Sequence, residues 1–308
     1  MKYSVVATTF NDSLDIIKYL EDISNQSYPP DEIVIADGGS KDDTVEKIKQ
    51  FSSMSSITIR VVEKGRLNIS QGYNEAIKAA ANDMIGITGV GNYYDQFFFE
   101  ELVNVIEKKN LDYVYSPIRG YNTNNFAKKY NTSLLHGDIG NSLDIASNHG
   151  ALVKKKIFEE LNYFYEKFIY AGEDAEFYSL VKKNGYKGEC VKTAKMYWKT
   201  PTSWHEFLKQ IRVYTIADLQ IHSKKQWRRL RKRVINLFML VVVIGAGVII
   251  VGVQGNVILK LLYALAIISI IIIKHRQLNP FRILNSYLPI FYTIKYKKYM
   301  NDEYAVRR

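Results

Sequence analysis

Two long apolar stretches near the C-terminus constrain this 308-residue chain more than any other feature. Residues 234–253 contain no charged side chain, and residues 257–273 contain only one, Lys260. A helix rises about 1.5 Å per residue and the hydrocarbon core of a bilayer is about 30 Å thick, so each stretch is long enough to cross once. The polar triplet Gln254-Gly255-Asn256 separates them. We therefore predict a transmembrane helical hairpin over residues 234–273.

The charge of the chain is divided at nearly the same place. The net charge of +11 combines −3 for residues 1–221 with +14 for residues 222–308. Basic residues flank both apolar stretches and the turn between them has no charge, so the positive-inside rule places both long ends in the cytoplasm. Nucleic-acid binding is not expected, because basic residues beside a membrane span are explained by topology.

These features predict a multi-pass protein of the cell (inner) membrane with its larger domain on the cytoplasmic side. Residues 222–233 form a basic juxtamembrane segment, and residues 274–308 form a basic, aromatic tail on anionic lipid. Within that tail, the segment from Pro280 to Met300 is either an interfacial helix or a buried element.

Residues 1–221 alternate strand and helix patterns. Runs rich in β-branched residues, such as Tyr3–Thr8, Glu32–Asp37 and Met84–Thr88, are separated by amphipathic runs with polar caps. Repeated strand–helix units with short connections predict an α/β domain with a mostly parallel, Rossmann-like sheet covered on both faces. The chain has neither a dinucleotide-binding fingerprint nor a P-loop. Functional residues are expected at the carboxyl ends of the strands.

Several short motifs at these strand ends resemble family 2 glycosyltransferases, which have the GT-A fold. Phe10-Asn11 follows the first strand, a Gly- and Asp-rich run from Asp37 to Thr44 follows the second, and Gly172-Glu173-Asp174 opens a later helix. Ile69–Ile77 resembles the family's helix near the donor pyrophosphate. The resemblance extends over roughly residues 2–215.

The resemblance implies inverting transfer of a sugar from a nucleotide-sugar donor. Asp174 matches the general base, which takes a proton from the acceptor hydroxyl as its oxygen attacks the anomeric carbon. The resemblance also implies that Glu173, Asn148 and His149 lie on the acceptor side of the site. The residues expected to contact the donor are Thr9, Phe10, Asn11, Asp37, Gly39, Arg66, Asn74 and Asn92.

One motif of that family is missing. Its members usually carry Asp-x-Asp after the fourth strand, which binds Mg²⁺ or Mn²⁺ at the diphosphate, whereas here Gly89 and Gly91 stand at the two carboxylate positions. Three interpretations stay open: a weaker metal site, neutralisation of the diphosphate by basic side chains, or loss of catalysis. The candidate metal ligands are Asn92, Asp95 and His205, and the candidate cations are Arg212 and Lys209.

The expected function is transfer to a lipid-linked or membrane-proximal glycan acceptor in the biosynthesis of a surface polysaccharide or glycoconjugate. A membrane anchor suits such an acceptor because tethering raises its effective concentration. Two alternatives compete: a polyprenyl-phosphate glycosyltransferase, and a catalytically silent membrane subunit that binds a nucleotide-sugar. A homo-oligomer is compatible with each of them.

Overall fold

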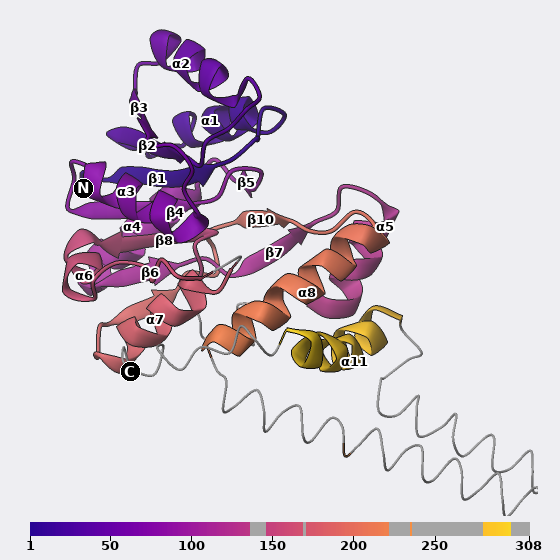
Figure 1. The fold of residues 1–308 in the computed structure, drawn as a ribbon. Helices are drawn as coiled ribbons and strands as arrows, with labels where there is room; N and C mark the ends of the chain where they lie inside the picture. Colours follow the sequence, from indigo (N-terminus) through magenta and orange to yellow (C-terminus); the bar gives the residue numbers. More distant parts are fainter. Residues whose placement is uncertain (136–145, 169–170, 222–234, 236–279, 297–308) are drawn as a thin grey trace, which may run out of the picture. The chain divides into compact units, whose positions relative to one another are not determined.

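The computed structural model describes residues 1–135, 146–168, 171–221, 235 and 280–296 (Figure 1). The chain divides into two compact units, residues 1–204 and 205–308, so the division precedes the domain boundary predicted at residue 221. The predicted hairpin over residues 234–273 lies outside the described part except for Ile235. In the described part, every helix is too short or too polar to cross a bilayer.

The first unit is built on a seven-stranded sheet with the strand order β3-β2-β1-β4-β8-β6-β9. Neighbouring strands are parallel except for β8, which is antiparallel to both β4 and β6. This arrangement confirms the predicted α/β domain with a mostly parallel sheet. The strands are β1 (Ser4–Thr9), β2 (Glu32–Asp37), β3 (Thr58–Glu63), β4 (Met84–Thr88), β6 (Tyr113–Tyr115), β8 (Gly150–Lys154) and β9 (Gly188–Cys190).

Helices pack on both faces of the sheet because successive residues of each central strand point to opposite sides. Val5 and Ala7 of β1 belong to one hydrophobic core, and Val6 belongs to the other. The helices of the first core are α1 (Ile16–Ser24), α2 (Thr44–Met54) and α4 (Phe98–Lys109). Those of the second core are α3 (Ile69–Ala79), α6 (Lys155–Glu160) and α7 (Glu173–Lys183).

A smaller sheet has the strand order β5-β10-β7. Its strands are β5 (Tyr93–Tyr94), β7 (Ile118–Tyr121) and β10 (Met196–Lys199). One tyrosine from each strand, Tyr93, Tyr121 and Tyr197, joins a ring cluster with centroids 5.8 to 6.5 Å apart. Between β6 and β8, the described part of the chain has β7, a short helix α5 (Asn125–Tyr130) and one π-helical turn η1 (Asn131–Leu135).

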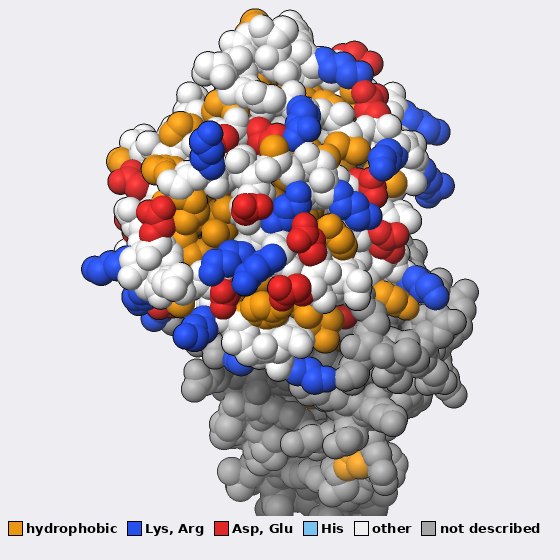
Figure 2. All heavy atoms as spheres, turned by 90° about the vertical axis from the view of Figure 1, so that its left-hand side faces the viewer, with side chains coloured by type: hydrophobic (Ala, Val, Ile, Leu, Met, Phe, Trp, Pro, Cys, Tyr) orange, Lys and Arg blue, Asp and Glu red, His pale blue; other side chains and the backbone are white. Residues whose placement is uncertain are grey.

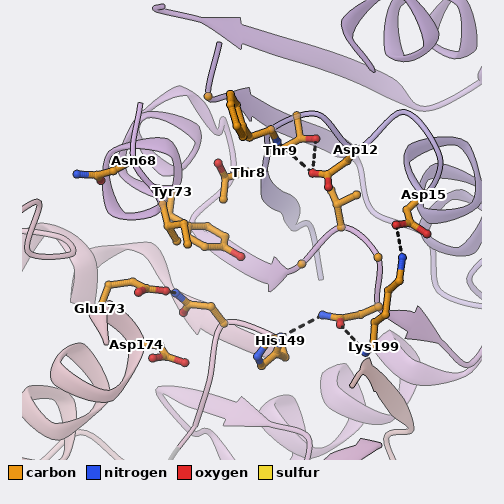
Figure 3. A pocket seen from close by; sticks show the side chains of 18 of the residues that line it. Thr8, Thr9, Asp12, Asp15, Asn68, Tyr73, His149, Glu173, Asp174 and Lys199 are labelled. Carbon is orange, nitrogen blue, oxygen red and sulfur yellow. Dashed lines mark hydrogen bonds and ion pairs between the residues drawn. The ribbon is translucent and has the colours of Figure 1, made fainter. Parts of the chain in front are cut away.

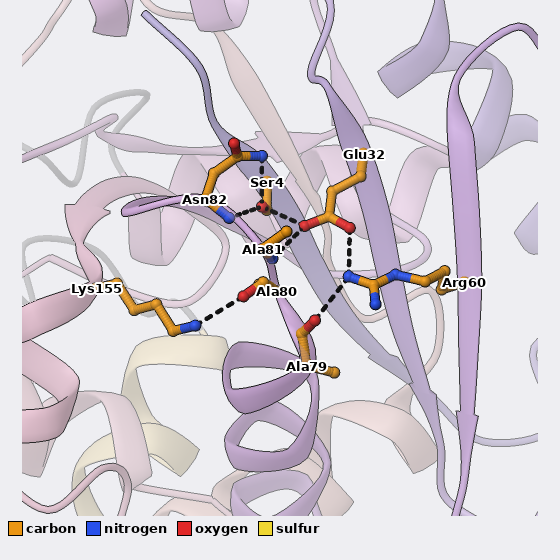
Figure 4. A network of polar contacts seen from close by, with 8 residues as sticks. All are labelled: Ser4, Glu32, Arg60, Ala79, Ala80, Ala81, Asn82 and Lys155. Atoms are coloured by element: carbon orange, nitrogen blue, oxygen red, sulfur yellow. Dashed lines mark hydrogen bonds and ion pairs between the residues drawn. The ribbon is translucent and has the colours of Figure 1, made fainter.

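A buried polar network fastens the opposite edge of the main sheet, where β1 and β2 begin (Figure 4). Glu32 is 5% exposed, accepts hydrogen bonds from the Ser4 hydroxyl and the Ala81 N–H, and forms an ion pair with Arg60. Burial acts to raise the pKa of Glu32, but these hydrogen bonds and the Arg60 charge outweigh it and lower the pKa. Asn82 also donates to Ser4, so the segment after α3 is tied to the sheet.

Basic and acidic side chains are interspersed on the face of the first unit that Figure 2 shows. This mixture agrees with the small net charge of residues 1–221. In the second unit, the described helices are α8 (Trp204–Ile221) and α11 (Pro280–Lys295). Phe207 of α8 packs on Phe281 of α11, with ring centroids 5.3 Å apart. The segment from Pro280 to Met300, predicted as either an interfacial helix or a buried element, is therefore helical from Pro280 to Lys295.

Candidate active site

A cavity of about 500 Å³ lies at the carboxyl edge of the main sheet (Figure 3). The loops after β1 and β4 line it, and the residues just before β8 join them because Gly150 of antiparallel β8 pairs with Thr88 of β4. Gly38 after β2, the first part of α3 with the turn before it, the start of α7 and the end of β10 complete the wall. Side chains therefore gather at the edge where the topology predicted them.

The loop after β1 presents Thr9 and Phe10 to the cavity, as expected for the donor side. Asp12 orders this loop, because its carboxylate accepts hydrogen bonds from the Thr9 hydroxyl at 2.8 Å and from the Phe10 N–H at 3.0 Å. The Phe10 ring remains 55% exposed. Both residues are thus placed where they can contact a ligand, and their donor-binding role stays a prediction.

The Gly- and Asp-rich loop after β2 is held mainly by its own hydrogen bonds. The buried Asp37 carboxylate accepts from the Gly39 N–H at 3.0 Å, the Ser40 N–H at 2.9 Å and the Ser40 hydroxyl at 2.6 Å. Gly39 has a φ of +88°, which favours glycine. Asn11 connects the two loops by accepting from the Lys41 N–H and donating its own N–H to Ser40. Asn11, Asp37 and Gly39 are not among the residues that line the cavity.

Asn74 and Arg66 are also absent from the cavity wall. The Asn74 side chain is 2% exposed, donates to the Phe164 carbonyl and the Glu166 carboxylate, and accepts from the Phe164 N–H, each at 2.9 Å. Its amide is therefore used in fastening the segment before α7 to α3. Arg66 is exposed on the turn before α3. Their predicted contacts with the donor stay predictions.

Tyr94 holds the glycine-containing loop after β4. Its hydroxyl accepts from the Gly89 N–H at 2.8 Å and donates to the His149 carbonyl at 2.7 Å. Asn92, which lines the cavity, donates its side-chain N–H to His149 Nδ1 at 3.1 Å. Burial lowers the pKa of His149 against the opposing charge of Asp174, so the imidazole is neutral at pH 7. A neutral ring that accepts at Nδ1 carries its proton on Nε2.

The donor set around this loop does not fit a resident divalent cation. Gly89 and Gly91 supply no carboxylate, the Asn92 side-chain oxygen accepts from the Lys199 N–H at 3.4 Å, and the Asp95 carboxylate accepts from the Phe97 N–H at 3.1 Å. In the part of the chain that the structure describes, no three His, Cys, Asp or Glu side chains form a group able to bind a metal. His205, Lys209 and Arg212 lie on α8 in the second unit, and their predicted roles stay predictions.

Two adjacent acidic residues at the start of α7 have different environments. Glu173 is 7% exposed, and its pKa is raised to about 8 by burial and by the nearby charge of Asp174, against a hydrogen bond from Asn148. Asp174 is partly exposed and lines the cavity. The preceding Gly172 has a φ of +108°, so a glycine is favoured at the residue that turns the chain into this helix. Glu173 is therefore mostly neutral at pH 7.

The sequence pattern missed residues that the fold brings to the cavity. Asp15 and Lys199 form an ion pair at 2.6 Å, and the Trp198 ring packs against His149 in a tilted arrangement with ring centroids 5.6 Å apart. Asp12 and Asp15 precede a helix, where acidic residues are common as caps, so their signal was ambiguous. Nothing in the sequence near Lys199 marks it, because the pairing of Lys199 with Tyr121 of β7 is a tertiary feature.

Two curated proteins match parts of the sequence. The chain is 32% identical over 108 residues to a protein of Methanococcus voltae, the dolichyl N-acetyl-alpha-D-glucosaminyl phosphate 3-beta-D-2,3-diacetamido-2,3-dideoxy-beta-D-glucuronosyltransferase. These residues are 34% of this chain and 34% of that protein. The poly(ribitol-phosphate) beta-N-acetylglucosaminyltransferase TarS of Staphylococcus aureus is 21% identical over 124 residues, which are 40% of this chain and 22% of TarS. The matches thus span about a third or less of these curated relatives.

Solved structures share the fold over a longer part of the chain. The mannosyltransferase PcManGT from Pyrobaculum calidifontis, in complex with GDP-Man and Mn²⁺, superposes with a TM-score of 0.71 at 15% identity over 96% of this chain and 88% of that chain. TarS residues 1–349 in complex with UDP-GlcNAc give a TM-score of 0.54 at 17% identity over 75% and 70%. At these identities the likeness shows the fold alone, and it confirms the expected GT-A-like architecture.

The family assignment comes from the first half of the chain. Residues 4–162, just over half of the sequence, match the family described as Glycosyl transferase family 2. This match includes the loops after β1, β2 and β4 and the residues before β8, which together form most of the cavity wall. The chain therefore belongs to glycosyl transferase family 2.

Proposed function

We propose that this chain transfers a sugar, with inversion, from a nucleotide-sugar donor to a hydroxyl group of a lipid-linked or membrane-proximal glycan. Family membership and the cavity support the transfer reaction. The acceptor class is suggested by the relatives, since one is named for a dolichyl phosphate sugar and the other for poly(ribitol phosphate). The apolar stretches over residues 234–273 suit the same acceptor class, because they favour location at a membrane.

The observation that carries the proposal is the contrast between Glu173 and Asp174. A general base must reach the acceptor hydroxyl and must be free to take its proton. Glu173 is buried and its pKa of about 8 keeps it mostly protonated at pH 7, so it is unsuited to this role. Asp174 also lines the cavity and, unlike Glu173, is partly exposed, which supports our choice of Asp174 as the base.

In the proposed step, covalent bonds form and break on the donor, the acceptor and Asp174. The acceptor oxygen forms a bond to the anomeric carbon while the bond from that carbon to the diphosphate breaks. The bonding electron pair leaves with the nucleoside diphosphate, and the acceptor proton moves to Asp174. Attack opposite the leaving group inverts the anomeric configuration.

The acceptor side of the cavity has polar and aromatic groups that suit a sugar. The Asn148 side chain lines the cavity and is 5% exposed, and its Oδ1 is buried with no hydrogen-bond partner among the described residues. A buried acceptor of this kind is favourable only when a ligand or a water donates to it. The partly exposed Trp198 ring lines the same cavity and offers an apolar face. A volume of about 500 Å³ is within the range of small-molecule sites.

The test uses the full chain in detergent with a panel of nucleotide-sugars, lipid-linked glycans and polyprenyl phosphate, and it measures release of nucleoside diphosphate. Asp174→Asn is expected to lower kcat by about 10²- to 10⁴-fold, because a base is lost, while donor affinity stays within about two-fold. Asp83→Asn, on the exposed turn before β4, is the control. Unchanged turnover in Asp174→Asn would contradict the proposal. Donor binding without turnover on every acceptor would favour a silent binding subunit.

A further inference from the structure

We propose that Lys199 supplies the positive charge that faces the diphosphate of the donor, with Asp15 holding its ammonium group beside Gly91. This inference rests on the proposed function, since it concerns a nucleoside diphosphate in the same cavity. Lys199 is the last residue of β10, and Asp15 immediately precedes α1. Figure 3 shows this pair on one side of the cavity, with Glu173 and Asp174 on the other.

The first argument is the space around Gly91. A Cβ atom on this residue would lie 3.6 Å from Asp15 Oδ2 and 3.7 Å from Lys199 Cδ, so the ion pair lies within van der Waals contact of this position. Gly91 also has a φ of +84°, where residues other than glycine are strained. The absence of a side chain at Gly91 therefore leaves the ion pair directly beside the loop after β4.

The second argument is the charge of the cavity wall. Among the described residues that line it, Lys199 is the sole lysine or arginine. His149 is neutral because burial lowers its pKa, and Glu173 is mostly neutral because burial raises its pKa. Asp12 already accepts two hydrogen bonds within its own loop. A dianionic or trianionic diphosphate that enters this cavity thus meets one cationic side chain, in a wall that also contains the acidic residues Asp12, Asp15 and Asp174.

The third argument is the accessibility of the ammonium group. The Lys199 side chain is 49% exposed although its Nζ lies 2.6 Å from Asp15 Oδ2. An ammonium group has three N–H donors, and the pair with Asp15 uses one of them. Its backbone is fixed as well, since the Lys199 N–H donates to Asn92 Oδ1 at 3.4 Å and Lys199 pairs with Tyr121 of β7. Two donors remain to bind phosphate oxygens from a fixed position.

This placement matters for the chemistry because negative charge grows on the diphosphate as its bond to the anomeric carbon breaks. A cation fixed beforehand beside that group stabilises the transition state more than the ground state. Lys199 takes no part in bond making or proton transfer in this account. It binds the leaving group and compensates its charge, which is the task that the missing carboxylates and their metal have in the resembled family.

The experiment measures binding of UDP and uridine, and of GDP and guanosine, to the full chain by calorimetry, in EDTA and with added Mn²⁺. The expected result is that one diphosphate binds more tightly than its nucleoside in EDTA, and that Lys199→Met reduces this ratio about 10- to 100-fold without weakening nucleoside binding. Lys199→Arg should keep most of the ratio, because it keeps the charge. Lys195→Met, an exposed lysine just before β10, is the matched control.

The possible failures are distinguishable. An unchanged ratio in Lys199→Met, in a variant whose thermal unfolding matches the parent, overturns the role of Lys199 and leaves the transferase proposal standing. Diphosphate binding that requires Mn²⁺ and is indifferent to Lys199→Met overturns it as well. If no nucleoside diphosphate binds under either condition, the proposed function fails together with this inference.

Discussion

The sharpest quantitative expectation concerns the buried acid Glu173. Its pKa rises from 4.5 in the unfolded chain to about 8 in the fold, because burial and the charge of Asp174 disfavour the ionised form. A group with a raised folded pKa contributes stability that is fully present below the unfolded pKa and is lost as pH rises through the folded pKa. Glu173→Gln keeps a neutral side chain of nearly the same shape as the protonated acid and removes the ionisable group.

The magnitude follows from the same two pKa values. Each pKa unit corresponds to about 1.4 kcal/mol, and linkage between 4.5 and about 8 gives a loss of about 3 kcal/mol between pH 6 and pH 9. Because Glu173 is 7% exposed, solvent screening removes little of this free energy. The parent chain should thus lose about 3 kcal/mol relative to Glu173→Gln over this range.

The assay is equilibrium urea unfolding of the full chain in detergent, followed by tryptophan fluorescence at pH 6, 7, 8 and 9. Glu159→Gln serves as the control, since Glu159 is exposed on α6. The free energies of unfolding of the parent and of Glu159→Gln should fall together, whereas that of Glu173→Gln should stay flatter. Parallel curves for the parent and Glu173→Gln would refute the reasoning, because Glu173 would then be ionised in the fold.

Three further substitutions test the contacts around the sheet. Tyr94→Phe removes the hydroxyl bonded to the loop after β4, and we expect urea unfolding to show a loss of about 1 to 3 kcal/mol. Glu32→Ala should lower the free energy of unfolding by about 2 to 3 kcal/mol at pH 7. The difference should shrink below pH 4.5, because protonation of Glu32 in the parent removes the stability that its lowered pKa provides. The control Glu63→Ala, in an exposed ion pair, should cost less than about 1 kcal/mol. Gly91→Ala and Gly65→Ala share a positive φ and should each cost about 1 kcal/mol in the same assay, but calorimetry should show weaker diphosphate binding for Gly91→Ala alone.

The elements of the first unit follow closely from local sequence. The expected strands Glu32–Asp37 and Met84–Thr88 have these same bounds in the structure, because each is an apolar run that ends in glycine-containing or polar segments. The helix expected from Ile69 begins there, since Asn68 and Gln71 form a reciprocal capping box. Periodicity and capping act within a few residues, so a single sequence contains the information needed for them.

Functional assignments by residue were less complete for a different reason. Asn74 and Asp37 are polar residues of family-like motifs, and the structure shows their side chains engaged with neighbouring backbone groups. Asn148 and His149 do line the cavity, but β8, whose antiparallel pairing puts them there, had no clear signal inside a polar segment. A motif identifies a loop, and the hydrogen bonds inside that loop decide which of its side chains remain available to a ligand.

The local pattern of residues was sufficient to indicate an α/β domain with its site at the carboxyl edge of the sheet, and it left the charge of that site open. That charge depends on contacts between distant residues: Lys199 meets Asp15 across 184 positions, and Asn92 meets His149 across 57. Burial in the folded domain also makes Glu173 mostly neutral beside Asp174. Distances and burial of this kind arise only when remote segments pack together, which is why the fold had to show how the cavity is charged.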